Sequence, residues 1–453
     1  MPNSLSPMEV LMTHLDNIRV SDIIPAHRSG DDILSLEHNQ TISVALKALS
    51  KRKILSAPLV VSPSLEDLAT DNDSVTSPVL VGWVDITTVL TGLISHLKGK
   101  NGGMLPHNML RLMKELESEG TVYAKSPLIT LSGGEDRSLL YCSEAGADWA
   151  PLKDTIRDQY LGLSADGYQK HRISHRIAVF DAHGVITQIV SQLDIVRYLC
   201  SNSDQLLGHV GGAQIQDIGL VQPKDAAASN MKHAAMRSGL VTVDPNMLTL
   251  LAFEHMLSQG VSGAPVVSES GDIVANLSVS DLRCIRPEHL GTLALPVAEF
   301  VALMHGTTYL GYSQGGSSHR HSHPFFGGSP KPKLDMSTLP SSPRNMKVSE
   351  EVERGVRLFT VHPTSTLNEV LHMLSDNQIH RVYITDPSCL EGQRLKGCIT
   401  PTDILRWVLS VNAAAQLPLK PDRSASSFPP TAEAVPRHHP GPQTHSNLIV
   451  RVT

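Results

Sequence analysis

The sequence predicts an α/β protein in which one strand–turn–strand–helix unit occurs four times. The clearest copy is Ile379 to Leu409, where two β-branched or aromatic runs flank a turn-rich segment and an apolar helical stripe follows. The plan recurs in Val261 to Arg283 and in His175 to Leu199, and more loosely in Leu55 to Leu90. Because one such unit cannot cover its own sheet, we expect the copies to pair.

The heads of the first strands alternate along the chain. The first and third copies carry Ala57-Pro58 and Ala264-Pro265, whereas the second and fourth carry His175-Arg176 and His380-Arg381. This alternation indicates two modules, the first repeat with the second and the third with the fourth.

Helical stripes precede the strand pairs. In the fourth repeat, Thr366 and Glu369 have the spacing of a capping box, and in the third repeat Gly260 is a stop signal. The residues that share a helix face are Ile42, Ala45, Leu46 and Leu49, then Leu250, Phe253 and Leu257, and finally Leu367, Val370, Leu371 and Leu374.

A hydroxyl and a carboxylate three residues apart stand where the second strand meets the helix. In the fourth repeat they are Thr400 and Asp403. Such a carboxylate can accept hydrogen bonds from ribose hydroxyls, as acidic residues do in dinucleotide folds, or the two residues can simply cap the helix. The equivalent pairs are Ser278 with Asp281 and Ser191 with Asp194.

The first repeat departs from this pattern. Asp85 stands where the hydroxyl is expected, and Thr88 stands where the carboxylate is expected. The interchange argues against ribose binding at this repeat.

The strand heads of the second and fourth repeats are candidates for phosphate binding. His175-Arg176 and His380-Arg381 each place a planar, multi-donor cation beside a titratable side chain. In the third repeat, Ser262, Gly263 and Ala264 are small where a backbone could approach an adenine, although small residues also allow two strands to pack closely.

The pattern resembles the cystathionine-β-synthase-type (CBS) domain, in which a strand ends near Ser or Thr and Asp follows three residues later. Four copies, with VSGAPVV in the third and His-Arg in the second and fourth, resemble the gamma subunit of the AMP-activated/sucrose-nonfermenting-related kinase family, including its plant-type gamma-like members. The resemblance covers residues 18 to 410.

This resemblance implies four CBS repeats paired into two modules that form a flat, pseudo-symmetric disk. It also implies AMP, ADP or ATP as a regulatory ligand, with no catalytic cofactor. The ribose would lie at the hydroxyl–carboxylate pairs, and the phosphates at the two His-Arg heads. The implied partners are a catalytic alpha-type Ser/Thr kinase subunit and a beta-type scaffold subunit, in the cytoplasm or also in the nucleus.

Composition and periodicity predict the domain boundaries. The Gly-, Ser-, Pro- and His-rich stretch before the fourth repeat cannot form a core, and its histidines lack acidic or thiolate neighbours for a metal. We expect repeats at 18–97, 121–202, 214–286 and 348–411, a connecting helix at 287–310, a disordered linker at 311–345 and a disordered tail at 412–453.

Composition narrows the class of protein. The chain has 453 residues, of which 41% are hydrophobic, and a formal charge of -6, which argues against a general nucleic-acid binder. The five cysteines form no Cys-x-x-Cys pair, so neither a zinc knuckle nor a disulfide framework is indicated. Without a signal sequence or a long apolar run, we expect a soluble, intracellular protein.

The sequence lacks the phosphate loop, the nucleophile turn and the His-Glu-x-x-His pair of common enzyme classes. The primary hypothesis is therefore a non-catalytic, nucleotide-binding regulatory subunit of a kinase complex. The alternatives are a structural scaffold with degenerate pockets and, less favoured, an uncharacterised hydrolase.

Overall fold

The structure is a computed structural model. Nearly all of the residues that it describes belong to one compact unit, Met1–Ala414. It describes residues 7–23, 33–62, 79–131, 141–143, 151–170, 173–180, 186–221, 240–305, 358–386 and 394–415.

The first, second and fourth repeats each contain a three-stranded sheet with one common plan. A short first strand pairs in parallel with the second strand, and the second pairs antiparallel with the third. The strands are β1 (Leu36–Glu37), β2 (Ser56–Val61) and β3 (Val79–Asp85) in the first repeat, β4 (Tyr141–Ser143), β5 (Arg176–Phe180) and β6 (Ile186–Ser191) in the second, and β9 (Thr360–Val361), β10 (Val382–Thr385) and β11 (Leu395–Ile399) in the fourth.

The third repeat follows the same plan with two strands, β7 (Gly263–Val267) and β8 (Ile273–Ser278), and Val243 bridges in parallel to Val266 in place of a first strand. In all four antiparallel pairs the register shifts by one residue near the turn end, for example between Leu59 and Val60. The predicted α/β repeat fold is confirmed, whereas the short parallel strand of each repeat was not predicted.

The predicted helices form on the predicted faces. In α2 (Ile42–Arg52) the whole apolar stripe is buried, and α10 (Leu367–Asp376) begins with the expected capping box. In that box Thr366 Oγ1 accepts from Glu369 N at 3.2 Å, and Glu369 Oε2 accepts from Thr366 N at 3.1 Å. In the third repeat, α8 (Thr249–Ser258) stops just before Gly260, whose φ of +68° suits glycine.

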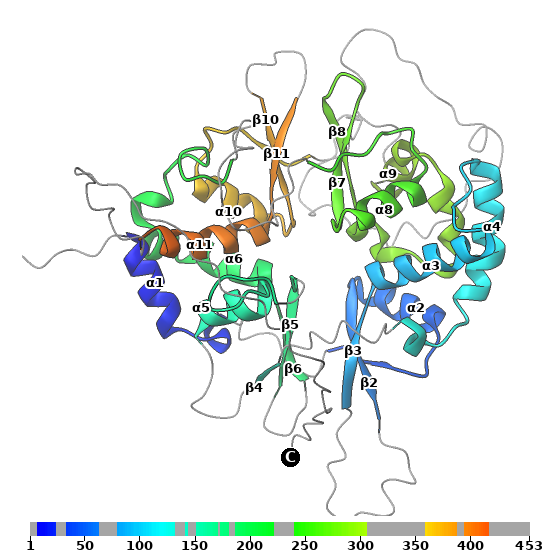
Figure 1. Ribbon diagram of the computed structural model, residues 1–453, viewed down its shortest axis with the longest axis horizontal. Coiled ribbons are helices and arrows are strands. Elements are labelled where there is room, and N and C mark those ends of the chain that lie inside the picture. Colours follow the sequence, from blue (N-terminus) through cyan, green and yellow to red (C-terminus); the bar gives the residue numbers. More distant parts are fainter. Residues whose placement is uncertain are drawn as a thin grey trace, which may run out of the picture. The chain divides into compact units, whose positions relative to one another are not determined.

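A further helix follows the last strand of each repeat. These segments are α3 (Ile86–Lys100), α6 (Gln192–Ser201), the 3₁₀-helix η7 (Val279–Cys284) and α11 (Pro401–Ala415). Each begins within two residues of the strand that precedes it in the chain, as Figure 1 shows for α3 after β3.

The described residues form two apolar cores, and each core is built from residues of two repeats. The first core joins the first and third repeats, and Phe253 and Phe300 meet in it edge to face at 6.4 Å between ring centroids. The second core joins the second and fourth repeats, where α6 packs against α10 (Figure 1). This corrects the expectation that pairing the first repeat with the second, and the third with the fourth, would complete the cores.

The boundaries at residues 18 and 121 also need correction. The N-terminal helix α1 (Pro7–Asn17) buries Leu11 and Leu15 in the second core, so residues ahead of 18 belong to it. Residue 121 falls inside α4 (Met109–Tyr123), which packs on α3 and on the 3₁₀-helix η8 (Pro287–Ala294) of the first core. Periodicity could not show these assignments because they depend on distant partners.

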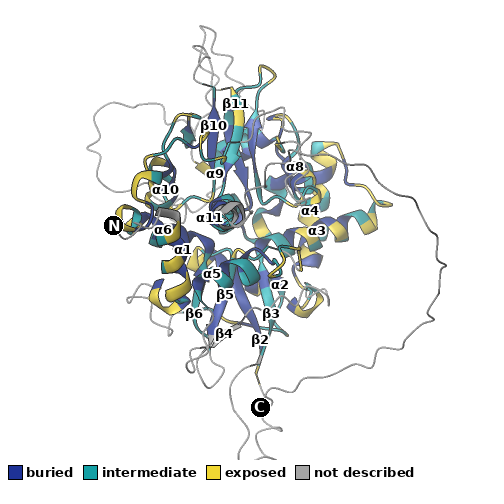
Figure 2. Cartoon of the chain, turned by 60° about the vertical axis from the view of Figure 1, so that its left-hand side comes forward, coloured by how far each residue is buried: buried dark blue, intermediate teal, exposed yellow. Residues whose placement is uncertain are grey.

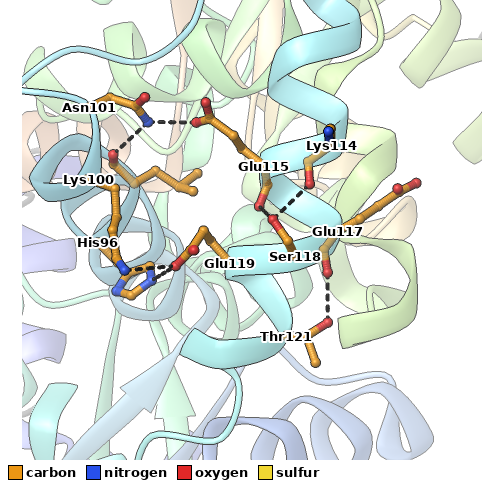
Figure 3. Close-up of polar contacts among 10 residues, drawn as sticks. His96, Lys100, Asn101, Lys114, Glu115, Glu117, Ser118, Glu119 and Thr121 are labelled. Atoms are coloured by element: carbon orange, nitrogen blue, oxygen red, sulfur yellow. Dashed lines mark hydrogen bonds and ion pairs between the residues drawn. The ribbon is translucent and has the colours of Figure 1, made fainter.

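Polar contacts fasten α4 to α3 (Figure 3). His96 Nε2 lies 3.1 Å from Glu119 Oε2, and Asn101 Nδ2 donates to Glu115 Oε2 at 2.6 Å. Tyr123 OH donates to the Val89 carbonyl oxygen at 2.7 Å, and burial strongly raises the pKa of this phenol. The end of α4 is thus part of the body of the first repeat.

The predicted connecting helix is two helical segments, η8 and α9 (Val297–His305). Because Phe300 is fully buried, α9 is part of the first core. In Figure 2 the strands β5 and β10 are mostly buried, and α3 and α4 carry exposed faces. The predicted linker at 311–345 and residues 416–453 of the predicted tail lie outside the described residues. Residues 412–415, which were also expected to be disordered, are the last turn of α11 (Pro401–Ala415).

Candidate functional site

The hydroxyl–carboxylate pairs lie at the ends of strands, where each forms a reciprocal helix cap. In the fourth repeat, Asp403 Oδ2 accepts from Thr400 N at 2.9 Å and from Thr400 Oγ1 at 2.6 Å. In the third repeat, Asp281 Oδ2 accepts from Ser278 N at 2.7 Å. The capping alternative raised by the sequence is therefore realised, and a ribose would have to use the remaining carboxylate oxygens.

These carboxylates differ in what else they contact. In the second repeat, Asp194 Oδ2 accepts from Ser191 N and Oγ at 2.8 and 2.7 Å, while Oδ1 pairs with Arg197 Nη1 at 2.8 Å in a buried position. Oδ1 of Asp281 lies 3.5 Å from His305 Nε2. Within the described residues, Oδ1 of Asp403 has no hydrogen bond.

The first repeat has the same two chemical groups in interchanged positions. Asp85 is the N-cap residue of α3, and its Oδ1 accepts from Thr88 N at 2.6 Å and from Thr88 Oγ1 at 3.1 Å. The cap survives because Asp caps helices as well as Ser does. The consequence is that the carboxylate stands on the last residue of the strand instead of one helical turn later.

The two predicted arginines each reach the strand head of a neighbouring repeat. Arg176 Nη1 donates to Ser56 Oγ, at the head of β2. Arg381 Nη2 donates to Ser262 Oγ and Nη1 to Asn276 Oδ1, both at 3.3 Å. These contacts link the first repeat to the second and the third to the fourth, so the predicted pairing is present at the strand heads.

The small segment Ser262, Gly263 and Ala264 receives Arg381. A Cβ atom on Gly263 would overlap the guanidinium group of Arg381. The close approach predicted for an adenine is occupied here by an arginine, which is a different physical reason for the small residue. An adenine-binding role for the segment remains a prediction.

The lowered pKa of His380 indicates that the two His-Arg heads lie close together. Desolvation, together with the positive charges of Arg381, Arg176, His175 and Arg283, lowers the pKa of His380 to about 4. For such charges to act on His380, residues from the second, third and fourth repeats must lie close to it. We call His175, Arg176, Arg283, His380 and Arg381 the cationic cluster.

His175 has a similar environment with two compensating neighbours. Desolvation and the charge of Arg176 lower its pKa, whereas a hydrogen bond with Gln192 and the charge of Asp85 act in the opposite direction. Both His175 and His380 keep solvent-accessible surface. Because the pKa of each ring is lowered from the ordinary value of 6.5, both imidazoles are mostly neutral at pH 7.

The arginines keep the cationic cluster positive. Burial lowers the pKa of Arg176 and the charge of Asp85 raises it, but a guanidinium stays charged at any physiological pH. Arg283 Nε is buried without a hydrogen-bond partner in the described part of the chain. A half-buried arginine with one buried, unused donor favours an anionic ligand.

Sequence reasoning missed several residues that complete this region. Arg283 gave no signal because one arginine after a cap is common on any helix. Asn276 and Tyr383 were also missed, although a polar residue inside a strand is unusual; Tyr383 OH donates to Asn276 Oδ1 at 2.5 Å. Gln192 is nearly fully buried, and its Oε1 accepts from Thr402 Oγ1 of the fourth repeat at 2.7 Å.

Neither a candidate metal site nor a candidate membrane span occurs among the described residues. They contain no group of three or more His, Cys, Asp or Glu side chains that could hold a metal ion. None of the helices there is long and apolar enough to cross a membrane. The histidines of the predicted linker lie outside the described residues.

Comparison with curated proteins finds Protein SDS23 of Kluyveromyces lactis, 22% identical over 51% of this chain and 39% of that protein. It also finds Protein sds23 of Neosartorya fischeri, 21% identical over 59% of this chain and 40% of that protein. The chain spans about two fifths of the length of these curated relatives. Both relatives are SDS23 proteins, so the resemblance to a kinase gamma subunit stays at the level of a proposal.

Among solved structures, the fold is similar to the crystal structure of protein MJ1225 from Methanocaldococcus jannaschii, described as a candidate archaeal homologue of g-AMPK. The TM-score is 0.47 at 16% identity, covering 86% of this chain and 99% of that one.

The family model of the CBS domain matches residues 231–286 and 352–410, which are the third and fourth repeats. The first and second repeats share the same strand order, hairpin shift and terminal cap. The chain therefore contains CBS domains in an α/β CBS-repeat fold.

Proposed function

We propose that this chain is a non-catalytic regulatory protein that binds an adenine nucleotide, AMP, ADP or ATP, between paired CBS repeats. The observation that carries the proposal is the cationic cluster. Three arginines and two histidines from three repeats act on one another there, and Asp85 is the acidic side chain that acts on His175 and Arg176. Such a concentration of positive charge is costly unless an anion offsets it.

The phosphates would lie at the strand heads. Arg176 and Arg381 present guanidinium groups that can each donate two parallel hydrogen bonds to phosphate oxygens. The neutral rings of His175 and His380 can each donate one N–H, and an arriving phosphate raises the pKa of both. A nucleotide held from both heads would contact two modules at once.

The ribose would lie at a strand end of the third or fourth repeat. Asp403 has an Oδ1 atom without a hydrogen bond among the described residues, and Asp281 gives up only a long His305 contact. Both carboxylates are partly accessible. The pair Ser191 and Asp194 is the least favourable ribose site, because Arg197 and the helix cap already engage both oxygens of that carboxylate.

Regulation requires that the ligand favour one arrangement of the protein over another. Mono-, di- and triphosphates would engage Arg176 and Arg381 differently, which offers such a difference. We propose a catalytic alpha-type Ser/Thr kinase subunit and a beta-type scaffold subunit as partners, on the resemblance of the repeats alone. Coupling of about 1–3 kcal/mol would change a partner's activity several-fold.

The test begins with the purified full chain. Calorimetric titration with AMP, ADP and ATP, together with thermal unfolding, should show binding and a raised melting temperature, because a ligand of the native state stabilises it. The Arg176→Ala and Arg381→Ala variants should each weaken binding. Reconstitution with the kinase subunits should then show AMP and ATP acting differently on kinase activity, and both variants should blunt that difference.

A second candidate function is a structural scaffold that assembles a complex without sensing nucleotide. It is favoured by the caps, which already use a carboxylate oxygen of Asp194, Asp281 and Asp403, and by Arg381, which fills the space over Gly263. A chain that assembles with partners but shows neither binding nor thermal protection by any of the three nucleotides supports this candidate.

A further inference from the structure

The interchange in the first repeat places a carboxylate beside the cationic cluster. Asp85 ends β3, and its cross-strand neighbour is Ser56. The same Ser56 hydroxyl accepts a hydrogen bond from Arg176. At the equivalent strand ends of the second and third repeats, Arg176 pairs in register with Ser191, and Gly263 with Ser278. The position that carries a neutral serine hydroxyl in those repeats, at Ser191 and Ser278, therefore carries the carboxylate of Asp85 in the first repeat.

Only one of the two carboxylate oxygens of Asp85 accepts hydrogen bonds within the described residues. Oδ1 of Asp85 accepts both hydrogen bonds from Thr88, and Oδ2 has no hydrogen bond within the described residues. No ion pair within contact distance joins Asp85 to Arg176 among those residues; Ser56 contacts the arginine instead. Asp85 therefore acts on the cluster through its field, which reaches both His175 and Arg176.

We propose that Asp85 is a built-in counter-ion of the cationic cluster and sets its preference among phosphate ligands by their charge. This inference rests on the proposed nucleotide-binding function. The carboxylate offsets part of the positive charge when no ligand is present. It also repels a bound phosphate, and the repulsion grows with each charge that the ligand carries. The first repeat would then disfavour triphosphates relative to monophosphates, although it holds no ribose of its own.

Because Asp85 is the N-cap residue of α3, the variants that remove its charge must keep a side chain that can cap the helix. Asp85→Ser restores the residue type of the second and third repeats and keeps an N-cap hydroxyl, and Asp85→Asn keeps the shape of the side chain; both residues cap helices well. Glu269→Gln is the matched control, since it removes one negative charge from the exposed β7–β8 turn. The double variant Asp85→Ser/Thr88→Asp keeps the net charge but moves the carboxylate to the position it has in the other repeats.

The measurement is calorimetric titration of each full-length chain with AMP, ATP and inorganic triphosphate at one fixed, moderate ionic strength. We expect Asp85→Ser and Asp85→Asn to bind ATP and triphosphate about tenfold more tightly than the parent, and AMP about threefold more tightly. Glu269→Gln should stay within about twofold of the parent, because solvent screens a distant surface charge. The double variant should follow Asp85→Ser for inorganic triphosphate.

Several outcomes would overturn the proposal. Unchanged ATP and triphosphate affinity in both Asp85 variants, with binding intact, removes Asp85 from the site while leaving the nucleotide-binding function in place. An equal gain in Glu269→Gln, or parental affinity in the double variant, would show that only total charge matters. If neither the parent nor the variants bind any of the three ligands, both proposals fall. If triphosphate binding responds as expected but AMP is not bound, the counter-ion stands and the adenine-nucleotide function falls.

Discussion

The two modules hold their arginines in different ways. In the first module, Arg176 of the second repeat meets the Ser56 hydroxyl of the first, with the Asp85 carboxylate next to it across the strands. In the second module, Arg381 lies over Gly263 and donates to Ser262 and Asn276, which are all neutral. Arg176 is thus partly balanced by the charge of Asp85, whereas Arg381 is positioned by close packing over Gly263 and by hydrogen bonds to neutral groups.

The same contrast extends to the carboxylates of the caps. The first module has one interchanged cap at Asp85 and one cap closed by Arg197 at Asp194. The second module has Asp281 and Asp403, whose Oδ1 atoms make fewer contacts. Asp281 Oδ1 lies near His305 only, and Asp403 Oδ1 has no hydrogen bond among the described residues. Under the proposed nucleotide-binding function, this difference would make the second module the better ribose site and leave the first to adjust charge.

The largest expected effect concerns ribose binding. Asp403→Ala and Asp281→Ala should each weaken nucleotide binding by roughly 1.5–3 kcal/mol, the usual contribution of a charge-assisted hydrogen bond. Asp194→Ala should change affinity little, since its carboxylate is committed to the cap and to Arg197. Calorimetric titration measures all three variants. Equal losses at Asp194 and Asp403 would erase the contrast between the modules.

The next effect concerns the fit over Gly263. Gly263→Ala should displace the Arg381 guanidinium and cost roughly 1–3 kcal/mol of unfolding free energy, the usual range for overpacking. Ser56→Ala, at the equivalent head in the first module, adds no bulk and is the matched comparison. Urea unfolding of Gly263→Ala, Arg381→Ala and the double variant measures the coupling. Additive losses would mean that the residues are independent.

A smaller effect is expected at Tyr383. Tyr383→Phe removes the donor to Asn276 Oδ1 and should cost about 1 kcal/mol, the net contribution of a typical hydrogen bond. The equivalent position of the second repeat, Ala178, has no such bond, so this contact belongs to the second module alone. Urea unfolding at neutral pH gives the value. A variant as stable as the parent would show that Arg381 alone satisfies Asn276.

The smallest effect is pH dependence at the histidines. The folded-state pKa of His380 is about 4, below the ordinary value of 6.5. Above pH 6.5 the ring is neutral in both states; as the pH falls from 6.5 towards 4, the unfolded chain takes up a proton that the folded chain does not, so stability is lost. His380→Gln should therefore lose less stability than the parent between pH 7.5 and 5.

His175 provides the comparison between modules for that experiment. Asp85 and Gln192 partly offset the groups that lower its pKa. His175→Gln should thus change the acid sensitivity less than His380→Gln does, measured by urea midpoints at the two pH values. A larger effect at His175 would contradict the electrostatic difference between the modules.

Much of each repeat could be predicted from sequence because the signals are local. The capping box at Thr366 and Glu369, and the hydroxyl–carboxylate pairs such as Thr400 with Asp403, depend on residues three apart. The stripe beginning at Ile42 needs only the helical period. The departure at Asp85 was also visible in the sequence, but its meaning was not, because Arg176 is far away in the chain.

By itself, the sequence determined the four strand–turn–strand–helix units, their caps and the alternation of their heads, since neighbouring residues set period, turn and cap. Only the tertiary structure decided that the apolar cores join the first repeat to the third and the second to the fourth. It also decided that Arg381 would meet Asn276, 105 residues away, and that burial and neighbouring charges would lower the pKa of His380. These outcomes depend on packing and on long-range charge, which no local pattern encodes.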